Sequence, residues 1–380
     1  MNVPQTGILT VMETSRTLRQ LSFGEHGAVH SYYDLPIESP DGSRIVYNAF
    51  DSEAIPGPVS VIVADRDGAN PRVIGHCTRG NGHVGAQAMW IDDDHVVYCP
   101  EGPSSKWSAI VKLGDEPDRY RRLDHKLRSF HRGRGLGAMT DGGGGHGGPG
   151  AIERFASMRQ LWLWQWPTGQ VQPLLHTDAV SAIHPRREQF DPACVNFQNP
   201  KFSPDGRRML VVMGDEVYCK PRKLKRRVKS LIVFDVDAAR PNPRYLGEFA
   251  DHPMWTPDGT AIIAHDHAPD GNGKTLSRFD VETGRTSVLL RRPLGVHPSM
   301  NRAATQVVTD PMGWPRPDQA AVVMYDLESG EHEVLATGGH GATDHETGCH
   351  VHPKFAANEK TVIFNMADTG VPQVYEVAAD

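Results

Sequence analysis

A short unit recurs along the chain and limits the folds available to it. Tight turns of the Ser-Pro-Asp-Gly or Thr-Pro-Asp-Gly kind occur at residues 39–42, 203–206 and 256–259, and weaker versions lie at 92–94, 301–302 and 356–358. Proline presets φ and glycine accepts positive φ, so these sequences favour turns. Each turn precedes an apolar run with the length of a buried strand. These runs are residues 45–47, 96–98, 209–212, 262–264, 307–308 and 362–364.

A second strand follows in each unit and ends in an acidic or glycine turn. These segments are residues 59–65, 109–113, 161–166, 231–235, 276–280, 322–326 and 374–377. They number seven against six clear first turns, so we expect the missing turn between Arg128 and Gly150. With 38 glycines, 29 prolines and almost no helical periodicity, the pattern predicts an all-β fold, a seven-bladed β-propeller.

The ends of the chain predict how this ring closes. The chain stops just after the third strand of the last unit, so residues 8–11 or 17–21 would supply the missing outer strand and protect an edge. The alternative is a disordered N-terminal arm. A propeller has no natural internal boundary, so residues 1–380 are expected to form a single domain.

Composition excludes several classes of protein. A formal net charge of -6 argues against a general nucleic-acid binder. Five scattered cysteines make a disulfide framework improbable. The N-terminus has no basic region followed by an apolar run, and no apolar stretch is long enough to span a membrane. We therefore expect a soluble, cytoplasmic protein with no membrane partner.

Histidines recur at the starts of the last three units. His252 and His297 are 45 residues apart, and His297 and His352 are 55 residues apart. The innermost strands of a propeller line its channel, so equivalent positions in successive blades form a ring. His350 precedes His352 by two residues and shares its face in an extended segment.

Four imidazoles at one channel mouth predict a divalent-metal site, for which zinc, manganese, iron and nickel are all suitable. Cys349 would favour zinc if its thiol faced the channel. The alternative is that these histidines only cap strands by hydrogen bonding. Asn199 and Gln87 occupy the same register in blades four and two. The other histidines near these segments, His30, His83, His340 and His345, lack this register and are expected on the surface or in loops.

These motifs resemble those of a known enzyme family. His350-x-His352-Pro-x-Phe, a lone His297, and His252-x-x-Trp-x-Pro-Asp-Gly are similar to motifs of oligogalacturonate lyases. Cys349 and His352 also match a Cys-x-x-His-Pro blade of the related ulvan lyases. The resemblance is clearest from about residue 195 to the end. It implies an intracellular seven-bladed propeller that cleaves an acidic oligosaccharide by metal-dependent β-elimination and leaves a 4,5-unsaturated sugar.

The resemblance also implies roles for individual residues. His297, His350 and His352 match the family's metal-binding histidines, and the implied ion is manganese or zinc. His252 matches a histidine that takes the proton or lies beside the metal, so it is expected as catalytic residue or additional ligand. The family's fourth ligand, a glutamine, is replaced here by Thr347, and Cys349 or His252 would fill that gap.

The family's catalytic arginine has no direct counterpart. Strict register places Ser230 at that position, and Lys229 and Arg227 are the nearest cations. Arg227 is therefore expected as the catalytic cation, with Lys229 as the other choice. A cation beside a uronate carboxylate would make the neighbouring C5 proton easier to remove.

Two other functions remain open. A propeller can be a non-enzymatic binding module, because the fold does not determine function. The same metal site could also serve a sugar hydrolase, an isomerase or a lyase for another uronate-containing glycan. No Gly-x-Ser-x-Gly motif is present, which argues against a serine hydrolase.

Overall fold

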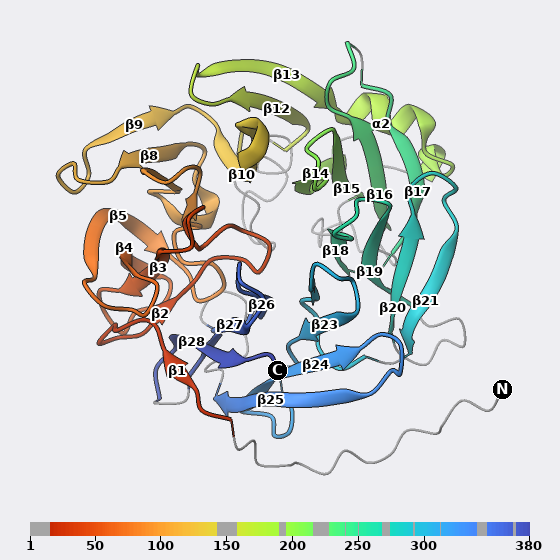
Figure 1. Cartoon of the computed structure of the whole chain (residues 1–380). Helices are drawn as coiled ribbons and strands as arrows, with labels where there is room; N and C mark the ends of the chain where they lie inside the picture. Colours follow the sequence, from red (N-terminus) through yellow and green to blue (C-terminus); the bar gives the residue numbers. More distant parts are fainter. Residues whose placement is uncertain are drawn as a thin grey trace.

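Seven four-stranded antiparallel sheets are arranged in a ring (Figure 1). A computed structural model of the chain describes residues 16–142, 158–189, 195–215, 228–239, 241–249, 251–267, 274–291, 293–311, 313–339, 348–367 and 370–380. The arrangement is the predicted seven-bladed β-propeller. All thirteen predicted apolar and alternating runs lie within or overlap its strands.

The first three blades use consecutive strands, numbered from the channel outward. Blade 1 contains β2 (Ala28–Val29), β3 (Arg44–Phe50), β4 (Gly57–Asp65) and β5 (Arg72–Gly80). Blade 2 contains β6 (Met89–Trp90), β7 (His95–Tyr98), β8 (Ser108–Lys112) and β9 (Tyr120–Leu123). Blade 3 contains β10 (Lys126–His131), β11 (Leu136–Thr140), β12 (Gln160–Gln165) and β13 (Gln170–His176). Its first turn ends at Gly135, within the expected interval.

Blades 4 to 6 follow the same order. Blade 4 contains β14 (Val195–Phe202), β15 (Arg208–Asp215), β16 (Val228–Asp235) and β17 (Arg244–Glu248). Blade 5 contains β18 (Asp251–Trp255), β19 (Ala261–His267), β20 (Lys274–Asp280) and β21 (Thr286–Arg291). Blade 6 contains β22 (Ser299–Met300), β23 (Gln306–Thr309), β24 (Gln319–Asp326) and β25 (His332–Gly339).

The seventh blade joins the two ends of the chain. It contains β26 (Lys354–Phe355), β27 (Thr361–Met366), β28 (Gln373–Ala378) and, as its outer strand, β1 (Arg19–Gln20). Arg19 is paired with Glu376, and Gln20 with Tyr375. The N-terminal closure is therefore confirmed for the second of the two expected segments, while residues 8–11 lie outside the described residues.

A buried ion-pair network crosses the seam between blades 7 and 1. Arg66 donates to Glu38 at 2.8 Å and to Glu376 at 2.7 Å, and Arg19 also pairs with Glu376. Glu38 is 7% exposed and Glu376 is 4% exposed. Buried charges of this kind are tolerated when each has its partner, so the network ties the two ends together.

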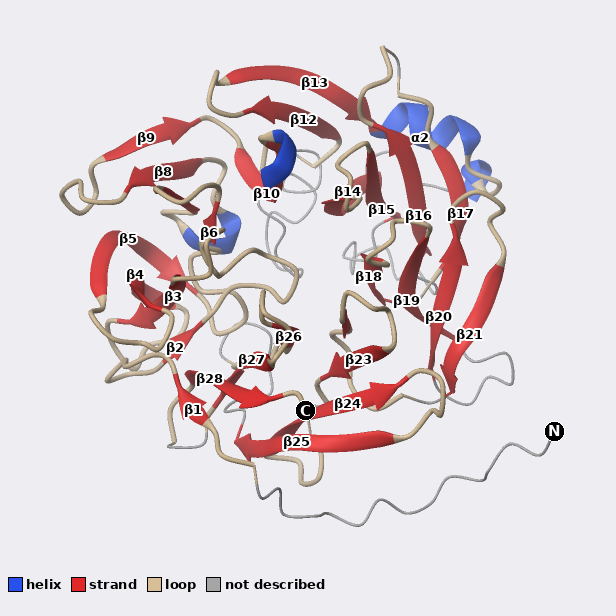
Figure 2. Cartoon of the chain, in the orientation of Figure 1, coloured by secondary structure: helices blue, strands red, loops and turns tan. Residues whose placement is uncertain are grey.

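Helices occur only in connections between strands in the described part of the chain (Figure 2). The α-helix α2 (Thr177–Ile183) joins blade 3 to blade 4 and contacts β17. The other helical segments among the described residues are three 3₁₀ turns, η1 (Gly102–Ser104), η2 (Arg132–Arg134) and η3 (Arg187–Gln189). No helix among the described residues has the length and apolar character needed to cross a membrane.

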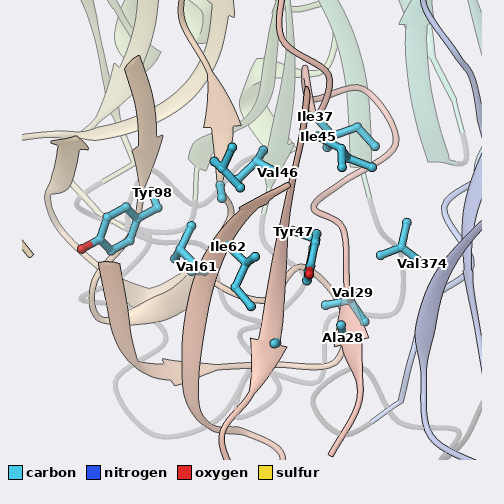
Figure 3. Packing of buried hydrophobic residues seen from close by; sticks show 14 of the residues in the cluster. Ala28, Val29, Ile37, Ile45, Val46, Tyr47, Val61, Ile62, Tyr98 and Val374 are labelled. Carbon is cyan, nitrogen blue, oxygen red and sulfur yellow. The ribbon is translucent and has the colours of Figure 1, made fainter. Parts of the chain in front are cut away.

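The hydrophobic core lies between neighbouring blades. Around blade 1, buried residues of β3 and β4 pack with Tyr98 of β7 and Val374 of β28 (Figure 3). Alternating strand residues bury one face of each sheet against the next. A fully buried aliphatic or aromatic side chain contributes about 1.5–3 kcal/mol relative to exposure. The ring is thus held by repeated sheet-to-sheet contacts.

Residues 30–38, here named the channel segment, leave β2 and extend toward the centre of the ring (Figure 1). Ser31 donates to the Ala88 carbonyl of blade 2 at 2.7 Å, and Lys354 of blade 7 donates to the Leu35 carbonyl at 2.6 Å. Lys201 of blade 4 pairs with Asp34 at 2.7 Å. The segment therefore connects opposite sides of the ring across the channel, an element absent from the sequence predictions.

Candidate metal centre

The blade starts share an unusual backbone conformation. Gln87, Asn199, His252 and His352 have φ angles of 55°, 46°, 52° and 48°. Residues other than glycine avoid positive φ, and they keep it where surrounding structure fixes them, often at functional sites. The shared conformation supports the predicted equivalence of these positions in blades 2, 4, 5 and 7. His297 does not share it.

Four histidines converge beside the channel segment. One potential ligand atom from each of His83, His297, His350 and His352 lies within 4.8 Å of the others. His297 precedes β22, and His350 and His352 precede β26. His83 lies in the loop between β5 and β6. The structure thus brings together three of the four predicted metal residues and adds one that was expected only on the surface or in a loop.

His252 lies beside this group without belonging to it. Its ring centroid is 4.4 Å from that of His297, and its Nδ1 atom is 3.8 Å from an Asp251 carboxylate oxygen. A further imidazole, His265, has its centroid 6.5 Å from that of His252. This position suits a proton-accepting residue next to the metal group, the other role that the resemblance implies.

Asp310 organises the histidine group and was not predicted from the sequence. Its Oδ2 atom accepts a hydrogen bond from His297 Nδ1 at 2.7 Å and from the His352 backbone N–H at 3.2 Å. Its Oδ1 atom accepts from the backbone N–H of His297 at 2.8 Å and from that of Val296 at 3.3 Å. Asp310 directly follows β23 and is 0% exposed. Its only sequence signal is that it follows a buried strand.

This hydrogen bonding fixes the tautomer of His297. An ionised carboxylate only accepts, so the proton must be on Nδ1 and the lone pair on Nε2. Burial would raise the pKa of Asp310, but His297 and its hydrogen bonds hold that pKa below the ordinary value. Carboxylate–histidine pairs of this kind orient metal-binding imidazoles.

The electrostatics of the group suit a metal ion. Burial, followed by the neighbouring imidazoles, lowers the pKa of His352 well below its ordinary value. A metal requires the neutral form. His352 is 0% exposed, and neither of its ring nitrogens has a hydrogen-bond partner in the described structure. Buried polar atoms are nearly always satisfied, so these residues fit a divalent ion.

Two tyrosines of the channel segment cover the group. The Tyr32 ring centroid lies 4.8 Å from that of His352, 5.5 Å from that of His83 and 5.6 Å from that of His297. Tyr33 accepts a hydrogen bond from Lys201 at 3.2 Å. Burial raises the pKa of both hydroxyls well above the ordinary value, so both stay protonated at neutral pH.

Of the two cations expected to support the substrate's charge, Arg227 and Lys229, only Lys229 lies among the described residues. Its Nζ atom pairs with Asp251 at 2.8 Å, next to His252. Ser230 is fully buried and its Oγ lies 2.8 Å from His184 Nε2, so it belongs to the blade interior. Arg227 lies outside the described residues.

The remaining sequence expectations have mixed outcomes. Cys349 packs in the hydrophobic core around blade 1 and is not in the histidine group, so the expectation of a possible thiol ligand receives no support. His30 lies in a loop, as expected, but is fully buried. Thr347, His340 and His345 lie outside the described residues.

Comparison by sequence gives no relatives: no protein-family model and no curated protein matches the chain. Solved structures do match. An oligogalacturonate lyase in complex with manganese gives a TM-score of 0.67 at 17% identity, over 96% of this chain and 93% of that chain. An oligogalacturonate lyase from Vibrio parahaemolyticus gives 0.67 at 15% identity, over 97% and 95%.

A propeller of another kind is also similar. The β-propeller domain of Cps50 (Swd1) from Myceliophteria thermophila gives a TM-score of 0.54 at 10% identity, over 92% of this chain and 96% of that domain. At such identities the likeness concerns the fold. The chain thus has the seven-bladed propeller fold seen in oligogalacturonate lyase structures.

Proposed function

We propose that the protein is a metal-dependent lyase that cleaves uronic-acid-containing oligosaccharides by β-elimination and leaves a 4,5-unsaturated sugar. The observation that carries this proposal is the four-histidine group with Asp310 behind it. A binding scaffold has no need for converging buried imidazoles. The fold likeness to oligogalacturonate lyases, one of them a manganese complex, supports the same chemistry.

In this proposal His297, His350, His352 and His83 hold the ion. A bound divalent ion would act as a Lewis acid towards a uronate carboxylate and so acidify the neighbouring C5–H. Imidazole ligands suit zinc, and manganese is the ion in one of the similar oligogalacturonate lyase structures. Asp310 keeps the His297 lone pair on Nε2, and the channel segment limits the access of water from its side.

His252 is the proposed base for the C5 proton. Burial, then the neighbouring imidazoles and lysines, lower its pKa well below the ordinary value, so it is neutral and able to accept a proton. Its Nδ1 atom has no hydrogen-bond partner among the described residues. Asp251, at 3.8 Å, would stabilise the imidazolium that forms.

The support of substrate charge is assigned to Arg227 or Lys229, as the register implies. Lys229 already shares its charge with Asp251. Through this pair Lys229 also holds Asp251, and with it the proton-accepting His252, in position.

The hydrogen-bond arrangement of the buried Ser230–His184 pair argues against a serine hydrolase. His184 Nδ1 accepts the Arg186 backbone N–H at 3.0 Å. Its Nε2 must therefore carry the proton and donate to Ser230 Oγ at 2.8 Å. A general base needs the opposite arrangement.

The test is to incubate the protein with uronate oligosaccharides and to follow the ultraviolet absorbance of the unsaturated uronate product. We expect a rise with manganese or zinc, no rise with chelator, and loss of both activity and bound metal in His350→Ala. The exposed His332→Ala is the matched control and should keep both. Metal binding without absorbance would redirect the proposal to another sugar chemistry, and absence of both would favour the binding module.

A further inference from the structure

Arg128 lies at an irregularity in the strand that lines the channel in blade 3. In β10, Leu127 pairs with Met139 of β11, but the next pair is Ser129 with Ala138. Arg128 is therefore the extra, bulged residue. Bulges redirect side chains and are frequent beside active sites. The inner strands of blades 4 and 5 have bulges too, at Asn199 and His252.

The guanidinium of Arg128 has no polar partner in the part of the chain that the structure describes. Burial lowers its pKa, and Cys99, Asp34 and Tyr32 oppose that effect from a distance. Asp34, the acidic group among them, is already paired with Lys201 at 2.7 Å. Arg128 is therefore a partly buried cation whose guanidinium stays accessible and has no anion paired with it among the described residues.

Other cations around the channel differ from Arg128 because each has a polar partner. Lys229 pairs with Asp251, Lys354 donates to the Leu35 carbonyl, and Lys126 donates to the Pro103 carbonyl. Arg128 is therefore a partly exposed cation that the described fold does not pair, and its guanidinium is available to an anionic group from the channel.

The channel segment connects Arg128 to the histidine group. Tyr32 and Arg128 are within electrostatic reach of each other. The Tyr32 ring in turn lies 4.8 Å from that of His352. An anionic ligand at the metal group would therefore have an uncompensated guanidinium nearby.

We propose that Arg128 is a specificity-determining residue that binds a carboxylate of the ligand and does so without the metal. A guanidinium forms paired hydrogen bonds with a carboxylate, a geometry that a lysine does not reproduce. This deepens the proposed function and rests on it for the choice of ligand. It adds a group that recognises substrate charge in blade 3 to the cation assigned in the Arg227 region.

The first test is binding of a galacturonate oligosaccharide to the full, chelator-treated protein by calorimetry, compared with its fully methyl-esterified form. The ester keeps the shape and removes the charge. We expect the acid to bind and the ester not to. Arg128→Gln should weaken acid binding roughly 10- to 100-fold, and Arg128→Lys should restore only part of it. Arg134→Gln, which breaks an exposed pair with Asp237, should bind as wild type.

The second test is stability without ligand. Arg128→Gln should unfold near the wild-type temperature, because the side chain is partly exposed and makes no pair within the described fold, whereas a structural arginine would lower that temperature. Equal binding by wild type and Arg128→Gln, equal binding of acid and ester, or no acid binding to folded wild type would each overturn the inference. Arg128-dependent binding without lyase activity would leave the inference standing and remove the proposed function.

Discussion

Replacing Asp310 by asparagine is the sharpest test of how the histidine group is built. Four N–H donors converge on its two carboxylate oxygens, at 2.7 to 3.3 Å. Asparagine offers one oxygen and one NH₂ group, so two donors face another donor whichever way the amide is placed. Hydrogen bonds to a charged group are worth about 1.5–3 kcal/mol each, so we expect a loss of about 3–5 kcal/mol in the free energy of unfolding.

The same substitution should weaken metal binding. If the NH₂ group faces His297, the imidazole must accept at Nδ1, and its proton moves to Nε2, where the ligand lone pair is needed. Loss of such a partner typically costs about 10- to 100-fold in metal affinity. Competition with a coloured chelator measures the affinity, and urea unfolding with and without metal measures stability.

Asp237→Asn is the matched control. Asp237 pairs with Arg134 at 2.7 Å on the surface, where exposed pairs contribute at most about 1 kcal/mol. Asp237→Asn should therefore leave the metal affinity unchanged and should change the free energy of unfolding by no more than about 1 kcal/mol. If Asp310→Asn behaved like this control, the argument that Asp310 orients His297 would be refuted.

Three further outcomes follow from burial and charge. Burial lowers the pKa of His30 to about 3 and that of His265 to about 4, from 6.5. Between those values the unfolded chain binds protons that the folded protein excludes. The free energy of unfolding should therefore fall below pH 6.5 by up to about 1.4 kcal/mol per pH unit for each group. Urea unfolding at stepped pH measures this, and His265→Gln should make the slope shallower. Glu376→Gln should cost about 1.5–3 kcal/mol, because Arg66 keeps Glu38 but loses a second, buried carboxylate partner at the seam. Arg19→Gln, at the half-exposed end of that network, should cost about 1 kcal/mol or less, and an equal loss would contradict the burial argument. Chelation should lower the thermal midpoint, because the ion binds the folded state alone, and an unchanged midpoint would mean that no ion is held.

The fold was predictable because its information is local. Turns followed by apolar runs marked six of the seven blades, and a propeller repeats that pattern at a spacing short enough to detect. The N-terminal closure was confirmed for the same reason, since a ring that lacks one outer strand must obtain it from the other end. His297, His350 and His352 could be predicted from the repeat, because they precede the inner strands of successive blades and these positions are equivalent in a propeller.

The rest of the site depends on contacts that leave no periodic signal. His83 lies in a loop, four residues before the register residue Gln87, and only the folded ring places it beside His350. Three of the four donors to Asp310 are backbone N–H groups, which carry no sequence signal. Tyr32 belongs to a segment that crosses the channel, and no repeat predicts where one connection departs from the others.

The histidine group spans the seam that closes the ring. His83 follows the first blade, whereas His350 and His352 begin the last, so the ligands come from near opposite ends of the chain. During synthesis the early blades can form sheets, but the ion has no complete site until the final blade joins the first. Metal occupancy would therefore report that the ring of blades has closed, and a bound ion would cross-link the first and last blades.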